Sequence, residues 1–161
     1  MKDFFLMFTL PRFATVPSMS RIAIELPSTW IYTLDLPVRI TDINYGQHLG
    51  NDAFLSMLQE ARVRWLHQYQ WTELDILGRG LIMVDLAVRF KTEAHFGHTL
   101  RFHLQPADWT EIRFELYALA THADTGKEIA RARTGMIFFD YTTRKMAKIP
   151  PGFRERIGCP E

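Results

Sequence analysis

Polar and titratable side chains crowd one short segment of this 161-residue chain, between residues 38 and 52. The segment holds the carboxylate of Asp42, the amide of Asn44 and the imidazole of His48. A carboxylate or an imidazole can accept a proton from water, and an amide can orient that water. Together, these residue types are suited to hydrolysis.

The end of the same segment predicts the start of a helix, with Asn51 or Asp52 as its N-cap. The first turn of a helix presents unpaired backbone N–H groups and a partial positive charge, which can polarise a carbonyl and hold an oxyanion. We expect Asn51 to cap the helix while its own N–H faces a reacting carbonyl. Asp52 is interpreted as an acidic side chain that stabilises the first turn of the helix through the helix dipole.

The three titratable candidates each have a catalytic and a structural interpretation. Asp42 is either a catalytic or histidine-orienting carboxylate, or a residue that caps the loop. His48 is interpreted as an acid, a base or a water-positioning group. Glu60 is a candidate base if partial burial suits it to that role, whereas an ion pair with Arg64, four residues on, would explain it without catalysis.

Hydrophobic spacing predicts the elements that must position these residues. Alternation predicts a strand over Tyr32–Ile40 and a later one over Leu81–Lys91. In the first, Leu34, Leu36, Val38 and Ile40 would share a face; in the second, Val84, Leu86, Val88 and Phe90. Between them, apolar residues spaced three and four positions apart predict an amphipathic helix over Asp52–Gln68.

Three more strands are predicted over Thr99–Ala107, Thr110–His122 and Glu128–Asp140, with a turn before the last. Pro150 and Pro151 are expected to end the ordered pattern. One long apolar helix followed by an antiparallel meander is an α+β plan, in which the sheet wraps around the helix.

Length and composition fit one globular domain, with 47% hydrophobic and 23% charged residues. A net charge of +1 gives no sign of nucleic-acid binding. The single cysteine, Cys159, excludes a disulfide framework and is compatible with the cytoplasm, where we expect the protein. Phe4–Leu10 is too short an apolar run for a membrane span, and no membrane association is expected.

The expected organisation has three parts. Residues 1–20 are predicted to be a flexible extension, of which Met1–Ser18 should be dispensable for folding. Residues 21–150 form the domain, and residues 151–161 are a C-terminal tail. No G-x-S-x-G, phosphate-loop, dinucleotide or H-E-x-x-H motif is present, so neither a metal nor a redox cofactor is expected.

The order of motifs resembles that of the 4-hydroxybenzoyl-CoA thioesterase family of hotdog-fold proteins. That family has a strand, the pattern V-R-x-x-D-x-D-x-x-G-H-V-N-N, and then a helix with E-A-R near its middle. The matching residues here are Val38-Arg39, Asp42, His48-Leu49, Asn51 and Glu60-Ala61-Arg62. The resemblance covers about Tyr32 to Asp140.

Three positions depart from the family pattern. Asn44 stands at the second aspartate, Gln47 at the glycine before the histidine, and Gly50 at the first asparagine of the pair. An asparagine is neither a nucleophile nor a base of the kind that the aspartate supplies. Another branch of hotdog enzymes uses a glutamate from the central helix, which makes Glu60 a candidate substitute.

The resemblance implies a hotdog-fold acyl-CoA thioesterase that hydrolyses an acyl thioester to free acid and CoA, with CoA as part of the substrate. The implied catalytic residues are Asp42, Asn44, His48, Asn51 and Glu60. Arg39, Arg62 and Lys91 would contact the CoA phosphates, or alternatively are solvated side chains. The family also implies a homodimer with sites at the interface, often doubled to a homotetramer.

Two other functions stay open. The first is a non-catalytic acyl-CoA or acyl-carrier binding protein, which Asn44 favours. The second is a hotdog dehydratase or hydratase, which would need Asp42 and His48 to act as a pair on the acyl chain.

Overall fold

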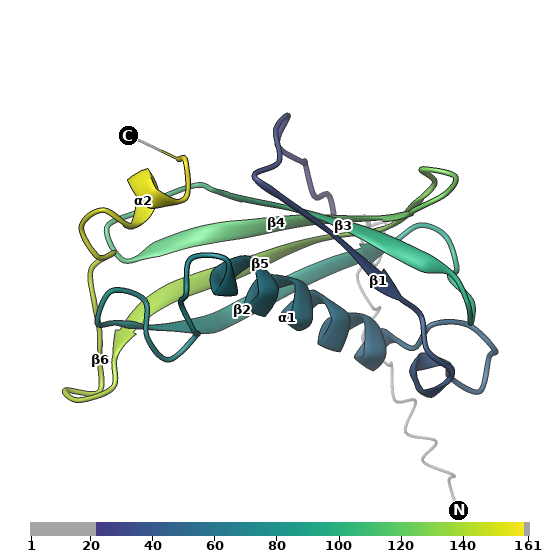
Figure 1. Cartoon of the computed structure of the whole chain (residues 1–161), viewed down its shortest axis with the longest axis horizontal. Coiled ribbons are helices and arrows are strands. Elements are labelled where there is room, and N and C mark those ends of the chain that lie inside the picture. Colours follow the sequence, from purple (N-terminus) through teal and green to yellow (C-terminus); the bar gives the residue numbers. More distant parts are fainter. Residues whose placement is uncertain (1–21, 160–161) are drawn as a thin grey trace, which may run out of the picture.

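The computed structural model describes residues 22–159, in which one antiparallel sheet carries a long helix across one face (Figure 1). The strands are β1 (Tyr32–Pro37), β2 (Gly80–Phe90), β3 (Thr99–Ala107), β4 (Arg113–His122), β5 (Glu128–Asp140) and β6 (Lys145–Met146). The helices are a 3₁₀ turn, η1 (Ile40–Asp42), then α1 (Asn51–His67) and α2 (Phe153–Arg156). The predicted α+β hotdog arrangement is confirmed.

The strand order is β1-β3-β4-β5-β2, with β6 beside β5. Both β1 and β2 therefore lie at edges, and consecutive strands β3, β4 and β5 form the predicted meander. The predicted extension, residues 1–20 with Met1–Ser18, lies outside the described residues.

The apolar stripe of α1 packs onto the sheet as its spacing predicts. Its buried side chains recur at three- and four-residue intervals, and Ala61 and Trp65 are fully buried. The ring of Phe54 lies 5.2 Å from that of Phe90 on β2 and 5.8 Å from that of Phe102 on β3. These contacts hold the N-terminal half of the helix against two strands that are far apart in the sheet order.

Two predicted strands end or begin three residues from the expected position, and β2 is shifted by one residue at both ends. The first strand stops at Pro37, because the chain then enters η1, and Ile40 is exposed rather than on the buried face. The predicted start of a strand at Thr110 is also wrong. Thr110 and Arg113 form a turn in which the Thr110 N–H donates to the Arg113 carbonyl (2.8 Å), and β4 begins only at Arg113.

The alternation predicted for β2 is interrupted near its start. The register with β5 shifts between Met83 and Asp85, so Val84 is the extra residue of a β-bulge. Val84 therefore does not continue the series of Leu86, Val88 and Phe90. Bulges are common on edge strands, and β2 is one.

The chain beyond Pro151 is part of the packed structure, so the expectation that order ends there is wrong. Phe153, in α2, is fully buried. Its ring lies 5.0–5.8 Å from those of Trp71, Phe114 and Phe138. A four-residue helix leaves little periodic signal in a sequence, and this one is held by tertiary packing.

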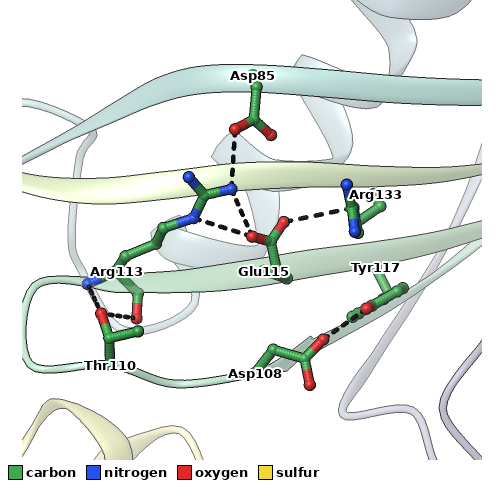
Figure 2. A network of polar contacts seen from close by, with 7 residues as sticks. All are labelled: Asp85, Asp108, Thr110, Arg113, Glu115, Tyr117 and Arg133. Atoms are coloured by element: carbon green, nitrogen blue, oxygen red, sulfur yellow. Dashed lines mark hydrogen bonds and ion pairs between the residues drawn. The ribbon is translucent and has the colours of Figure 1, made fainter.

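The other face of the sheet carries an ionic network (Figure 2). Because side chains alternate along a strand, Glu115 points away from its core neighbours Phe114 and Leu116. Arg113 donates to Glu115 from Nε (2.9 Å) and to Asp85 on β2 (2.8 Å). Arg133 on β5 approaches Glu115 at 3.7 Å. The network therefore links β4, β5 and the edge strand β2.

Gly135 on β5 makes room for this network. A Cβ built on Gly135 would collide with the Arg113 guanidinium and lie 2.7 Å from Asp85 Oδ1. On the same face, the hydroxyl of Tyr117 donates to Asp108 (2.6 Å). Burial, and then the bond to Asp108, raises the pKa of Tyr117 to about 12.

Phe153→Ala should destabilise the protein by about 3–5 kcal/mol, because it removes a fully buried ring from a cluster of aromatic side chains. Urea unfolding of the full chain measures this difference. Glu155→Ala, at an exposed position of the same helix, is the matched control and should change stability by less than about 0.5 kcal/mol. Equal stability of the two variants would show that α2 is not anchored by Phe153.

Candidate functional site

The loop between η1 and α1 is closed by its own backbone. Ile43 and Leu49 form an antiparallel bridge, and the Asn44 N–H donates to the His48 carbonyl (2.9 Å). The Gln47 N–H donates to the Asn44 carbonyl (3.0 Å), and Gln47 adopts a positive φ of 61°. The loop thus has one compact conformation, with Asn44 and His48 at its base.

The connection between β2 and β3 holds this loop from outside. The Leu49 N–H donates to the Ala94 carbonyl (2.8 Å). Nδ1 of His95 lies 3.1 Å from the Gln47 carbonyl oxygen, and since a carbonyl only accepts, Nδ1 is the donor. Residues 43–49 are therefore fixed to the sheet as well as to the helix.

Asn44 and His48 are in direct contact. The Asn44 Oδ1 lies 2.9 Å from His48 Nδ1 and also accepts the Gly46 N–H (2.8 Å). Gly46 permits this close approach, because a Cβ there would lie 2.9 Å from His48 Cε1. Sequence reasoning did not single out Gly46, although Asn-x-Gly is a turn signature that could have indicated it.

The helix begins one residue earlier than predicted, and the predicted N-cap is wrong. Gly50 is the N-cap, and α1 has no side-chain capping bond. The Gly50 N–H donates to the Asp42 carbonyl (2.9 Å), and the Gly50 carbonyl accepts the Phe54 N–H (2.9 Å). Asn51 and Asp52 are therefore inside the first turn, whose backbone N–H groups no side chain caps.

His48 and Asn51 line the same hollow, which has a volume of about 240 Å³. Phe90 and Ile129 give it an apolar wall, and Lys91 also lines it. The structure thus brings together Asn44, His48, Asn51 and the cationic candidate Lys91. Phe90 belongs to the edge strand β2, so the hollow borders the open edge of the sheet.

Asp42 is separated from this group by its own ion pair. Its side chain is 6% exposed and accepts from the backbone N–H of Arg39 (2.8 Å) and from the Arg39 guanidinium (3.1 Å). Burial alone would raise the pKa of Asp42, but the hydrogen bonds and charge of Arg39 outweigh it and hold that pKa below its usual value. This is the loop-capping arrangement that the sequence offered as the alternative, and the catalytic role of Asp42 and the phosphate contact of Arg39 stay predictions.

Glu60 lies with Asp42 in a second, smaller hollow of about 180 Å³, which His48 and Asn51 do not line. Its carboxylate accepts from Arg64 at 2.6 Å, which is the four-residue ion pair that the sequence offered as an alternative. The Asp42–His48 pair that a dehydratase would need is not formed, since Asp42 binds Arg39 and His48 binds Asn44.

Arg62 is buried and donates to Glu73 at 2.6 Å. This partner is eleven residues away, beyond the end of the helix, and its position left no signal in the sequence. Arg62 thus has a partner within the protein, and the predicted contacts of Arg39, Arg62 and Lys91 with the CoA phosphates stay predictions.

Other features of the described chain lie away from the predicted site. A hollow of about 640 Å³ lies beside α2 and is lined by none of the predicted site residues. Within residues 22–159, no cluster of histidine, cysteine and acidic side chains is arranged to hold a metal ion. None of the helices in that range is long and apolar enough to cross a bilayer.

Asp42→Asn should destabilise the protein by about 1.5–3 kcal/mol at pH 7, because hydrogen bonds to a charged partner are lost. The folded pKa of Asp42 is lowered, so its stabilisation is present above the unfolded value of about 3.9 and disappears as pH falls through the folded value. Urea unfolding at pH 7 and pH 3 should show the gap between wild type and variant narrowing. Asp124→Asn, which removes an exposed carboxylate from the turn before β5, is the matched control; a gap independent of pH would contradict this role.

Comparison with solved structures finds the same fold in thioesterases. A 1,4-dihydroxy-2-naphthoyl-CoA thioesterase from Synechocystis is 24% identical, with a TM-score of 0.72 over 79% of this chain and 95% of that one. A probable thioesterase from Escherichia coli is 21% identical, with a TM-score of 0.69 over 78% and 95%. The 12:0-ACP thioesterase from Umbellularia californica is 16% identical, with a TM-score of 0.67 over 79% and 49%.

No curated protein matches the chain significantly. The model of the thioesterase-like superfamily matches residues 38–157, which is well over half of the sequence and includes the loop, α1 and all the strands after it. The chain therefore belongs to the thioesterase-like superfamily.

Proposed function

We propose that this thioester hydrolase acts on acyl-CoA, releasing free acid and CoA. The observation that carries the proposal is the shared hollow, in which an imidazole and the uncapped start of a helix meet an apolar wall and a lysine. An acyl chain suits the apolar wall, and the CoA phosphates suit Lys91. CoA is then part of the substrate, and the reaction needs no separate cofactor.

The start of α1 supplies the electrostatic part of the mechanism. Its first-turn N–H groups are uncapped by side chains, and together with the helix dipole they favour negative charge. A thioester carbonyl placed there would be polarised, and its oxygen would be stabilised as it becomes an oxyanion. Asn44 and His48 lie beside this point, where an attacking water must be held.

A second function, binding of acyl-CoA or an acyl carrier without turnover, is favoured by one observation. The residue next to His48 is Asn44, an amide that cannot accept a proton from water, where the family pattern has a carboxylate. Release of a free thiol separates hydrolysis from binding, and it also separates hydrolysis from dehydratase chemistry, which leaves the thioester intact.

The wild-type protein should release free thiol from at least one member of a panel of aliphatic and aromatic acyl-CoA thioesters. A thiol-reactive dye measures the release, and calorimetry with a non-hydrolysable thioether analogue measures binding. The same acyl groups on an acyl carrier protein test the carrier. Binding of the analogue without thiol release from any substrate would favour the binding function, and no binding would reject the ligand class.

We also propose a homodimer, or a homotetramer built from two dimers, with Asn44 and Asn51 near the subunit interface. The supporting feature is the open edge of β2, where Met83, Val84 and Phe90 are each nearly half exposed. An unpaired edge with apolar side chains favours pairing with a second copy. Phe90 also lines the hollow, so the partner would lie beside the site.

Val84→Lys should shift the protein toward monomer, because it puts a charge on the open edge of β2. Sedimentation velocity at micromolar protein measures the change. Lys145→Ala, on the exposed strand β6, is the control and should leave the mass unchanged. A wild-type protein that is strictly monomeric at that concentration would contradict the assembly proposal.

A further inference from the structure

We infer that Nε2 of His48 is the general base of the hydrolysis and that Asn44 is the positioning residue that equips it for this role. The inference rests on the proposed function and names the group that accepts the proton. It follows from hydrogen bonds within the loop and from the ion pairs that Asp42 and Glu60 form with arginines.

The identity of one Asn44 atom is fixed by its neighbours. The Gly46 backbone N–H can only donate, so the atom that it contacts at 2.8 Å is the amide oxygen and not the amide nitrogen. The same oxygen lies 2.9 Å from His48 Nδ1. An oxygen with two lone pairs can accept both bonds, and it cannot donate either.

The state of His48 follows from that assignment. If Nδ1 carried no proton, its lone pair would face the lone pair of the Asn44 oxygen at 2.9 Å, which is repulsive. The neutral ring therefore carries its proton on Nδ1, and its in-plane lone pair is on Nε2. Within residues 22–159, Nε2 has no hydrogen-bonding partner. His48 lines the hollow, and an imidazole lone pair without a partner can accept a proton from water.

Two of the predicted proton acceptors, the carboxylates of Asp42 and Glu60, are already bound to arginines. Asp42 accepts three hydrogen bonds from Arg39, and Glu60 accepts one from Arg64. Both line the second hollow rather than the one that contains His48 and Asn51. Glu93 also lines the hollow of His48, but its exposed carboxylate lies 3.9 Å from Nε2 of His95. His48 lines that hollow together with the uncapped start of α1, and we assign the base role to it.

The step balances with these groups alone. A water gives one proton to Nε2 while its oxygen bonds to the thioester carbonyl carbon, and the carbonyl electron pair moves to the oxygen beside the first-turn N–H groups. When that pair returns, the carbon–sulfur bond breaks. The departing thiolate takes the proton from Nε2, which yields the acid and the free thiol and restores the neutral ring.

The experiment combines turnover with a direct measurement of the tautomer. Full-length protein labelled with ¹⁵N-histidine should give the His48 Nδ1–H signature in the wild type and lose it in Asn44→Ala. His48→Gln should lower kcat by ~10²–10⁴-fold with little change in KM, as expected for a positioned base. Asn44→Ala should lower kcat by roughly 10- to 100-fold, the range found where partners orient histidines at metal sites.

Asn44→Asp tests the positioning role by rescue. A carboxylate also accepts the proton of Nδ1, so this variant should keep the wild-type tautomer and preserve or raise kcat. His67→Ala, at the exposed end of α1, is the histidine control and should leave kcat and the His48 signal unchanged. Circular dichroism melting curves show whether each variant is folded.

Three results would overturn the inference. They are an Nε2–H signature for His48 in the wild type, near wild-type kcat in folded His48→Gln, and a loss confined to Glu60→Gln. If no acyl-CoA is hydrolysed, the proposed function and the base assignment both fail. The tautomer measurement, made without substrate, still decides the role of Asn44.

Discussion

A backbone hydrogen bond from Gly50 to the carbonyl of Asp42 closes the loop on which the site depends. It joins the end of η1 to the N-cap of α1, so the chain leaves the edge of the sheet and enters the helix within eight residues. Because Gly50 caps the helix without a side chain, the N–H groups of the first turn stay uncapped. The Asp42 side chain holds the same turn through its ion pair with Arg39.

The amphipathic elements were the part of the fold that the sequence predicted well. Strands β3 and β5 have the predicted bounds, because alternation and turn residues mark both ends. Errors arose where tertiary contacts overrode local pattern. The apolar residue Ile40 follows the alternation of β1, yet η1 turns it outward, and the buried Phe153 belongs to a helix too short to show a period.

The site was predictable to the extent that its groups are close in sequence. Asn44, His48 and Asn51 lie within one short stretch of the sequence. Asn44 contacts His48 directly, and His48 and Asn51 line the same hollow. The Glu60–Arg64 ion pair was also predictable as one of two alternatives, because its partners are four residues apart on α1. The partner of Arg62 could not be predicted in this way, because Glu73 lies beyond the end of the helix.

At Gly135, side chains from the neighbouring strands limit the size of the residue that can be accommodated. A glycine in the middle of a strand normally weakens it, since it packs no side chain and loses more conformational freedom on folding. Here the volume that its side chain would occupy is filled by the Arg113 guanidinium from β4, which extends over it to Asp85 on β2. The size of the residue at position 135 is thus limited by an ion pair between its two neighbouring strands, and a scale of strand propensity carries no information about that limit.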